Sequence, residues 1–292
     1  MVVTILGWGS GSVASRAALL EGAEPLTVAA VRLFIGVVLV VAYTLIVDRG
    51  LPSDPQIWRR GGLLGVLNMG AGTMLFIVAL QYVSAGYQGM MLALSPVVTA
   101  VIAHFMLSDE PLRITTLVGL AVGMAGVAMM VLSSQTGLAE GGNAVRGSVL
   151  SFTGVVVVSL GGVYARRYAS QHRVIELGVA QVVVGTVIGC VGAIALDGID
   201  LELSANAWLL IGYTGVFGTA LPFLSYLWAS QHASATRVAT TGYVIPVVSL
   251  VGGLIFIDEI VTLTILVGGT LIMAGVVLID WTEGRRTKGV AL

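Results

Sequence analysis

The segment SPVVTAVIAHFMLSDEP (residues 95–111) places a proline inside an apolar run and closes that run with an Asp-Glu pair. A second segment, IPVVSLVGGLIFIDEI (residues 245–260), repeats the pattern, and Pro246 follows Pro96 by 150 positions. A proline within a helix removes a backbone hydrogen bond and bends the helix. The return of this feature at a matched position indicates a chain built from two copies of one helical unit.

The composition predicts that these helices lie in a membrane. Of the 292 residues, 57% are hydrophobic and only 10% are charged, whereas soluble domains carry about 25% charged residues. A soluble globule of this length could not bury so much apolar surface, so we expect an integral membrane protein surrounded by the lipid bilayer. The net charge of −1 gives no indication of a nucleic-acid partner, and the single Cys190 excludes a disulfide framework.

Apolar segments of about 20 residues, the length that crosses a bilayer, recur along the whole chain. They lack the alternating pattern of a membrane β-barrel, and only helices or closed barrels satisfy all of their backbone groups in lipid. The predicted fold is therefore all-α and integral to the membrane. We expect ten transmembrane helices, at 2–20, 26–47, 61–82, 85–107, 113–132, 147–168, 174–196, 207–230, 234–256 and 262–281.

Basic residues gather on one side of this predicted arrangement. If the N-terminus is cytoplasmic, the outer loops hold Arg146 and mostly acidic residues. The positive-inside rule then predicts a multi-pass protein of the bacterial inner (plasma) membrane with both termini in the cytoplasm. The basic residues in or beside the cytoplasmic connections are Arg49, Arg59, Arg60, Arg113, Arg166, Arg167, Arg173, Arg237, Arg285, Arg286 and Lys288.

The repeat predicts how the two halves are oriented. Asp109-Glu110 matches Asp258-Glu259 at an offset of 149, so the copies extend well beyond the prolines. We expect two five-helix units, residues 1–137 and 138–292, with a polar linker at 133–146. Because five is an odd number, the second unit must enter the membrane upside down. Two inverted five-helix repeats related by an axis in the membrane plane are an architecture of transporters.

Three long stretches carry a family resemblance: WGSGSVASRAALLEGAEPLTVAAVRLFIG (8–36), LQYVSAGYQGMMLALSPVVTAVIAHFMLSDEPL (80–112) and QHASATRVATTGYVIPVVSLVGGLIFIDEIV (231–261). In these stretches and their order, the chain resembles the drug/metabolite transporter superfamily, specifically its bacterial EamA-like ten-helix exporters. The resemblance implies export of small metabolites, often amino acids, and does not fix the substrate. The family usually closes its fourth and ninth helices with Gly-Glu, and this chain has Asp-Glu there.

Polar and aromatic side chains within the predicted helices are candidates for lining a central cavity. Such a cavity, walled by helices 1, 3, 4, 6, 8 and 9, would suit a small amphipathic solute. The same side chains could instead bond to their own or a neighbouring helix, or form interfacial aromatic belts. The candidates are Trp8, Ser12, Asn68, Gln88, Met91, Ser95, Ser159, Tyr164, Tyr213 and Tyr243.

Pro96 and Pro246 are candidate gating positions. In lipid, the carbonyl freed by a mid-helix proline needs a partner or a wet cavity. We therefore expect the fourth and ninth helices to bend around the cavity and hinge during transport. The alternative is that both prolines make static kinks that improve helix packing.

Charged residues within predicted membrane helices are functional candidates by default. Arg16 and Arg32 could bind a substrate carboxylate, or they could reach outward or pair with Glu21 or Glu24. The Asp-Glu pairs are expected to cap the helices that follow them. The sequence places no acidic residue near the centre of any predicted span. That absence favours facilitated movement over coupling through a buried carboxylate, and it argues against export of cationic drugs.

These observations predict a transporter without enzymatic activity. The sequence contains no Walker A motif and no His-Glu-x-x-His motif, so we expect no catalytic residue, no bound metal and no cofactor. The predicted function is export of small metabolites by alternating access through a central cavity, carried out by a monomer. Amino acids are the leading substrates, with aromatic or large apolar ones favoured. The alternatives are a broad exporter of drugs or lipophilic compounds, a membrane enzyme acting on a lipid-linked substrate, and a channel.

Overall fold

The computed structural model describes residues 1–47, 50–107, 114–138, 141–168, 171–196, 198–232 and 241–289, the last eleven of these as backbone only. Within those ranges the regular structure is helical, and no strand is present. The helices are α1 (Val2–Leu20), α2 (Pro25–Val47), α3 (Pro55–Leu64), η1 (Gly65–Gly72), α4 (Thr73–Ala79), α5 (Ala85–Leu92), α6 (Ser95–Met106), α7 (Ile114–Leu132), α8 (Ala144–Tyr168), α9 (Val174–Leu196), α10 (Ala205–Gly215), η2 (Val216–Ala220), α11 (Leu221–His232), α13 (Thr241–Phe256) and α14 (Leu263–Gly289).

In the described part of the chain these helices form ten passes, because three passes are composite. The third pass joins α3, η1 and α4, the fourth joins α5 and α6, and the eighth joins α10, η2 and α11. Seven of the ten are long and apolar enough to cross a membrane, and α13 and residues Leu263–Leu278 of α14 form shorter apolar stretches. The remaining pass, α1, is rich in glycine and serine. The prediction of an all-α membrane fold with ten helices is confirmed.

The starts of several helices follow from capping residues in the sequence. The Asp54 side chain accepts a hydrogen bond from the Gln56 amide at 2.8 Å, and Pro55 occupies the first turn of α3. Aspartate at the cap and proline in the first turn are strong helix-start signals. The third pass therefore begins at Pro55 rather than at residue 61, the predicted start, because this exposed cap extends the helix beyond its apolar part.

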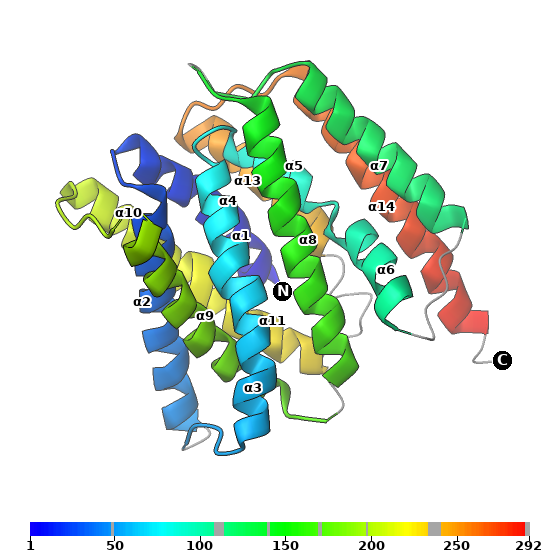
Figure 1. Cartoon of the computed structure of the whole chain (residues 1–292). Helices are drawn as coiled ribbons and strands as arrows, with labels where there is room; N and C mark the ends of the chain where they lie inside the picture. The colour runs from blue at the N-terminus through cyan, green and yellow to red at the C-terminus, as the bar shows by residue number, and fades with distance from the viewer. Residues whose placement is uncertain are drawn as a thin grey trace.

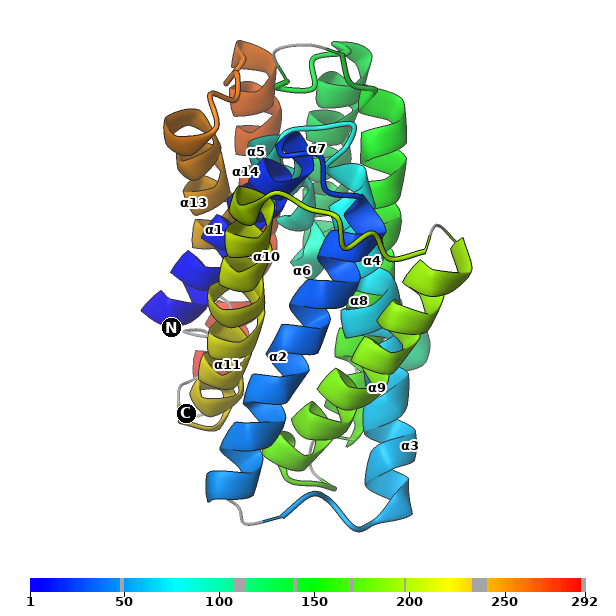
Figure 2. The ribbon, with the colours of Figure 1, turned by 90° about the vertical axis from the view of Figure 1, so that its left-hand side faces the viewer.

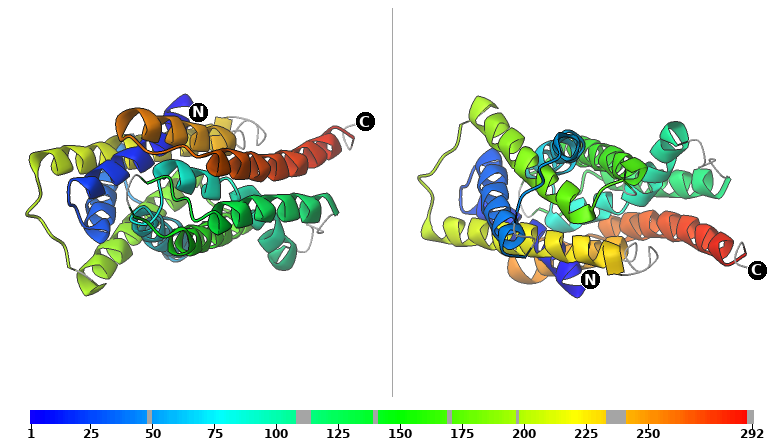
Figure 3. Two further views of the ribbon diagram at one scale, coloured as in Figure 1. Left: turned by 90° about the horizontal axis from the view of Figure 1, so that it is seen from above. Right: turned by 90° about the horizontal axis from the view of Figure 1, so that it is seen from below.

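The passes alternate in direction along the length of the molecule (Figures 1 and 2). We name two ends as drawn in Figure 1. The lower end holds the end of α2 and the start of α3, together with the end of α8 and the start of α9. The upper end holds the ends of α1, α4 and α13. Seen along this direction, the molecule is elongated, with α7 and α14 at one extremity and α2, α9 and α10 towards the other (Figure 3).

The neighbours of each pass are those that an inverted repeat requires. The second pass packs against the seventh (α2 with α9), the fourth against the ninth (α5 with α13), and the fifth against the tenth (α7 with α14). The first pass packs against the ninth (α1 with α13), and its counterpart, the sixth, packs against the fourth (α8 with α6). Exchanging the first five passes for the last five leaves this set of contacts unchanged.

Glycine permits the closest of these contacts. A Cβ added at Gly126 on α7 would collide with the Gly268 carbonyl oxygen on α14, and one at Gly275 on α14 would collide with the Gly119 carbonyl oxygen on α7. The two contacts are reciprocal, so α7 and α14 meet backbone to backbone. Small residues at helix interfaces allow this approach in membranes.

Apolar side chains divide between the interior and the outer surface. The largest buried cluster contains Tyr87 and Met91 of α5, Met130 of α7 and Ile272 of α14. Other large apolar side chains point outward, as Ile46 does with 78% of its surface exposed. An exposed apolar surface of this kind is suited to lipid rather than to water.

Candidate transport pathway

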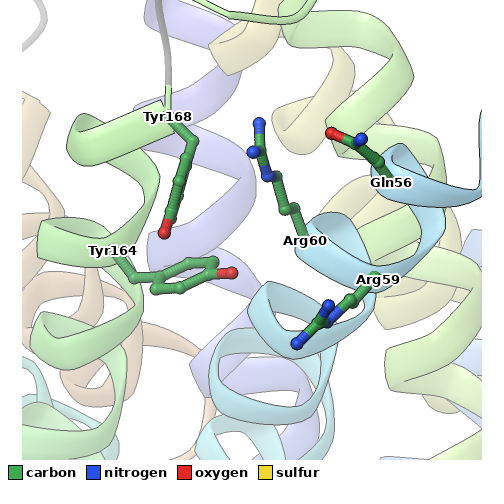
Figure 4. Close-up of a pocket in the computed structure, with 5 residues that line it drawn as sticks. All are labelled: Gln56, Arg59, Arg60, Tyr164 and Tyr168. Atoms are coloured by element: carbon green, nitrogen blue, oxygen red, sulfur yellow. The ribbon is translucent and has the colours of Figure 1, made fainter.

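A cavity of about 350 Å³ opens at the lower end, between the start of α3 and the end of α8 (Figure 4). Its lining combines two cations, two phenol rings and one amide. None of the five lining side chains is acidic. They are Gln56, Arg59 and Arg60 from α3, and Tyr164 and Tyr168 from α8.

Arg60 is held in place by several groups at the mouth of the cavity. Its guanidinium lies over the ring of Tyr168, 4.4 Å from the ring centroid. Its Nη1 donates hydrogen bonds to Oε1 of Gln171 at 2.5 Å and to Nε2 of His172 at 2.6 Å. The ring of Tyr164 lies 4.9 Å from that of Tyr168. The cavity therefore has a fixed cation stacked on one of two packed rings.

At the upper end, hydrogen bonds join the two halves. Glu259, in the connection between α13 and α14, is only 6% exposed. Its Oε1 accepts a hydrogen bond from the Ala85 amide at 2.7 Å, and its Oε2 accepts one from the Gly86 amide at 3.3 Å. A carboxylate at a helix N-terminus satisfies free amides and favours the helix dipole. Glu259 thus caps α5 of the other half, and not the following α14 as the sequence led us to expect.

Burial and partners act in opposite directions on Glu259. Burial raises the pKa of this carboxyl above its ordinary value of 4.5. The Ala85 and Gly86 amides and the nearby guanidinium of Arg16 oppose that rise. Arg16 is itself fixed, since its Nη1 donates to the Leu80 carbonyl at 2.9 Å. The acidic residue that interacts electrostatically with Arg16 is Glu259, whereas the alternatives considered from the sequence were Glu21 and Glu24.

Backbone hydrogen bonds from the polar linker also join the two halves at the upper end. The Ser84 amide donates to the Thr136 carbonyl at 2.9 Å, and the Ile260 amide donates to the Gly137 carbonyl at 2.9 Å. The Asn143 amide donates to the Tyr82 carbonyl at 3.1 Å. The linker thus joins the start of α5 to the connection after α13.

Two π-helical segments interrupt matched passes, the third at η1 and the eighth at η2. The segment η1 packs against α9 and α8, and η2 packs against α2 and α1. These neighbours are related by the repeat, so the two interruptions occupy equivalent places in the two halves. Short π segments occur frequently at functional sites. The amino-acid pattern does not reveal them, because neither segment contains a proline or another residue that marks a change in helix type.

Arg32 of α2 binds the second π segment. Its Nε donates to Oγ1 of Thr219 at 3.1 Å, and its Nη2 donates to the Gly218 carbonyl at 2.9 Å. Its Nη1 donates to Oγ of Ser15 on α1 at 3.0 Å. A π segment changes the backbone pairing of a helix, and here Arg32 supplies a donor to the Gly218 carbonyl. Arg32 therefore joins α1, α2 and η2.

The predicted cavity residues are distributed over several places. Tyr164 lines the cavity at the lower end. Ser95 and Ser159 are brought together, because Oγ of Ser159 donates to the Ser95 carbonyl at 3.3 Å. Asn68 lies in η1, and its Oδ1 is buried without a hydrogen-bond partner in the structure.

The other candidates pack against neighbouring helices. Met91 is fully buried in the main apolar cluster, and Nε2 of Gln88 donates to the Phe76 carbonyl. Trp8 packs against Tyr226, with ring centroids 5.4 Å apart, and Oγ of Ser12 donates to the Trp8 carbonyl at 3.4 Å. The hydroxyl of Tyr213 lies 2.9 Å from Oγ of Ser10. Tyr243 lies beside a small apolar cluster between α6 and α14.

The two prolines differ in their local structure. Pro96 lies in the first turn of α6, directly after the break that separates α5 from α6. Pro246 lies inside α13, which is a continuous helix from Thr241 to Phe256. The residues between α11 and α13, and those of the first Asp-Glu pair, lie outside the described part of the chain.

Sequence reasoning does not single out Glu259, Arg60 or the π segments as candidate site features. It gives Glu259 a capping role, and it uses Arg59 and Arg60 only for membrane orientation. The sequence does hold one indication that the two arginines could belong to a site. They are adjacent at the start of a predicted helix, and Tyr164 and Tyr168 lie one turn apart at the end of another helix on the same side of the membrane. Their convergence depends on the packing of α3 near α8, which no single segment encodes.

Comparison with protein families gives a match over most of the chain. The model of the EamA-like transporter family matches residues 1–132 and 145–280. The two matched segments fall on either side of the linker.

Individual relatives carry transporter names or a related description. The chain is 27% identical to the uncharacterized transporter YvbV of Bacillus subtilis, over 99% of this chain and 92% of that protein. It is 26% identical to the uncharacterized inner membrane transporter YedA of Escherichia coli K12, over 84% of this chain and 78% of that protein. It is also 26% identical to a chloroplastic WAT1-related protein of Arabidopsis thaliana, over 95% of this chain and 68% of that protein.

A solved crystal structure shares the fold. It superposes with a TM-score of 0.63 at 20% sequence identity and covers 97% of this chain and 98% of its own.

Proposed function

Because the chain belongs to the EamA-like transporter family, a family of multi-pass membrane transporters, we propose that it exports small metabolites across a bacterial inner membrane. Amino acids are the proposed substrates, and aromatic or large apolar ones are favoured. The proposed mechanism is alternating access by a single copy of the chain, with both termini in the cytoplasm.

The observation that carries this proposal is the difference between the two ends. The upper end is joined by Glu259 and by linker hydrogen bonds, whereas the lower end has a cavity lined by Arg59 and Arg60. If the positive-inside rule is followed, the arginines mark the cytoplasmic side. We propose that this arrangement is the state closed to the outside and accessible from the cytoplasm, in which an exporter loads its substrate.

The repeat supplies a route from this state to its opposite. The halves have matched contacts, so an outward-accessible arrangement can form by rocking one half against the other. Release of Glu259 from the start of α5 would open the upper end. In this proposal the π segments and Pro246 are the places where the passes deform.

The alternative of broad drug export fits the cavity less well. Lipophilic drugs exported by such proteins are commonly cations, and the lining of the cavity carries two arginines and no acid. The proposal of metabolite export therefore takes precedence.

The test is an uptake screen in proteoliposomes with labelled amino acids, with and without a pH gradient. Transport of phenylalanine, tryptophan or leucine above the level of protein-free vesicles is the expected result. If no amino acid moves, the proposed substrates are wrong. If movement requires an imposed pH gradient, the transporter is proton-coupled and facilitated movement is wrong.

A further inference from the structure

We propose that the cavity between α3 and α8 is a loading site that binds the carboxylate of the substrate. Its preferred ligands are aromatic or large apolar carboxylic acids, and a compensating positive charge on the ligand weakens binding. This inference rests on the transport function proposed above and adds a charge preference to it.

The charges of the lining carry the first part of the argument. Arg59 and Arg60 both line the cavity, and none of the five lining residues is acidic. Guanidinium groups bind carboxylates with two parallel hydrogen bonds, which are stronger than hydrogen bonds between neutral groups. A ligand ammonium group would find two like charges and no carboxylate among the lining side chains. The lining therefore favours a net anion over a zwitterion and a zwitterion over a cation.

The hydrogen bonds of Arg60 leave its Nε and Nη2 donors available for a carboxylate. Its Nη1 has two hydrogens, and these are directed to Gln171 and His172. The Nε hydrogen and both Nη2 hydrogens remain, because a guanidinium carries five donors. The Nε and Nη2 donors form a side-on pair that matches the two oxygens of a carboxylate. Since Gln171, His172 and the Tyr168 ring fix the guanidinium, little conformational entropy is lost on binding.

Arg59 adds a second cation that has no hydrogen bond or ion pair among the described residues. Its side chain is exposed at the mouth, next to Gln56. In Figure 4, Arg59 and Arg60 extend from α3 and face Tyr164 and Tyr168 of α8. A carboxylate placed between the arginines would leave the rest of the ligand beside the two rings. Aromatic groups gain affinity from such contacts beyond the effect of their buried area.

Topology alone does not account for this arrangement. The positive-inside rule requires arginines near the cytoplasmic ends of helices, but not that they converge on one cavity. Arg167 provides the comparison, because it lies at the same end of α8 and is exposed without lining the cavity. Arg167 thus stands outside the cavity, whereas Arg59 and Arg60 line it together with Tyr164 and Tyr168.

The test uses three ligands that share a phenyl ring and differ in charge. They are 3-phenylpropanoate, an anion; phenylalanine, a zwitterion; and 2-phenylethylamine, a cation. Binding to the purified full chain in phosphatidylcholine nanodiscs is measured by calorimetry at neutral pH. We expect the anion to bind most tightly, phenylalanine less tightly and the amine least.

Variants place this binding at the cavity. We expect Arg59→Gln to weaken 3-phenylpropanoate binding by about tenfold, the effect of losing one charge-assisted hydrogen bond. Arg167→Gln removes the same charge from the same end and is expected to leave binding unchanged. Because both side chains are exposed, we expect both variants to keep the melting temperature of the wild type, which confirms that they fold. Equal losses in the two variants, or equal binding of all three ligands, would overturn the proposal.

A second arm separates a solute from a lipid headgroup, which offers the same anionic chemistry. The measurements are repeated in nanodiscs that contain phosphatidylglycerol. Retained binding of 3-phenylpropanoate supports a solute site. Loss of that binding, together with phosphatidylglycerol retention that Arg59→Gln abolishes in native mass spectrometry, assigns the cavity to lipid and overturns the solute proposal.

The outcome is distinguishable from failure of the proposed function. Amino-acid transport without a charge preference in binding would reject the loading site and leave the transport function intact. Binding of 3-phenylpropanoate without transport of any amino acid would support the loading site and reject amino acids as the transported substrates.

Discussion

At the scale of the residue, Arg32 is a cation that serves as a structural donor. It donates to Thr219, Gly218 and Ser15, and each of these acceptors lies on another helix. The sequence correctly marked an arginine within a membrane helix as unusual. It could not identify its partners, because the carbonyl of Gly218 faces Arg32 only when η2 has formed and packed against α2.

Replacement of Arg32 by glutamine is expected to destabilise the protein. Hydrogen bonds to a charged group contribute about 1.5–3 kcal/mol each, and a buried acceptor left without a donor costs about 1–3 kcal/mol. We therefore expect Arg32→Gln to lower the free energy of unfolding by about 3 kcal/mol, measured as a fall in melting temperature in detergent. Arg167→Gln, at an exposed arginine, is the control. Equal melting temperatures for the two variants would show that the three contacts contribute nothing.

Glu259 is expected to make the upper end sensitive to pH. Burial raises the pKa of its carboxyl above 4.5, so protonation occurs at a higher pH than for an exposed glutamate. The exposed carboxyl of an open upper end has the ordinary pKa, so the buried carboxyl of the closed end binds a proton more readily. Protonation therefore favours closure, and closure weakens as the pH rises through the raised pKa.

The measurement is the transport rate in proteoliposomes as the pH on the upper side is lowered. We expect the wild-type rate to fall as the pH is lowered through a range that begins above 4.5, because protonated Glu259 favours the closed upper end. Glu259→Gln is expected to flatten this dependence. Asp258→Asn, which removes a neighbouring but exposed charge, is expected to retain it. An unchanged pH profile in Glu259→Gln would contradict a latch at this position.

At the scale of the element, the matched prolines act in different settings. Pro96 occupies the first turn of α6, where no helical amide bond is lost, whereas Pro246 interrupts the interior of α13. Proline is well tolerated in the first position and costly in the interior. The sequence repeat predicted equal roles, and the structural difference arises from the break at residues 93–94.

Alanine substitutions should separate the two prolines. Pro246→Ala restores an amide donor within α13 and straightens the helix, so we expect transport to fall more than protein abundance. Pro96→Ala changes a position where the amide is not needed, and we expect a smaller loss of transport. Uptake normalised to the amount of reconstituted protein is the measurement. Parallel losses of transport and abundance in both variants would assign the prolines to assembly.

Close packing of η1 against α9 depends on the absence of a side chain at Gly65. A Cβ at this position would collide with the Gln181 carbonyl oxygen, whereas a Cβ at Gly62 would lie at ordinary contact distance from Val184. Overpacking of this kind costs about 1–3 kcal/mol. We therefore expect Gly65→Ala to lower the melting temperature, and Gly62→Ala to leave it unchanged or to raise it slightly. Similar melting temperatures for both variants would mean that η1 can shift away from α9.

At the scale of the whole molecule, the sequence was most informative. Hydrophobic segment lengths and the repeat predicted ten helices in two halves, because these properties are distributed over the full chain and tolerate local errors. The site was less predictable. Gln88 and Met91 share a helix face that suits a cavity, yet both are buried in packing, since periodicity tells which residues share a face and not what covers it.

The position of the termini is a testable property of the whole arrangement. The chain makes ten passes in its described part, and an even number returns to the side where it began. We expect reporter fusions at the N-terminus and at the C-terminus to give the same signal, that of the cytoplasm. A modification reagent applied from outside the cell should label neither. Opposite signals from the two fusions would contradict the ten-pass arrangement.

The reciprocal glycine contacts between α7 and α14 have a consequence for how such a molecule can arise. Gly119 and Gly126 of one half meet Gly275 and Gly268 of the other, and these positions correspond in the repeat at an offset of 149. A separate chain of five helices that carries only Gly119 and Gly126 would present this glycine surface to an inverted copy of itself. Such a chain has the helix surface that an antiparallel homodimer needs. Gene fusion then needs to add only a linker. After fusion the sequences of the two halves can diverge while the glycine contacts between α7 and α14 are kept.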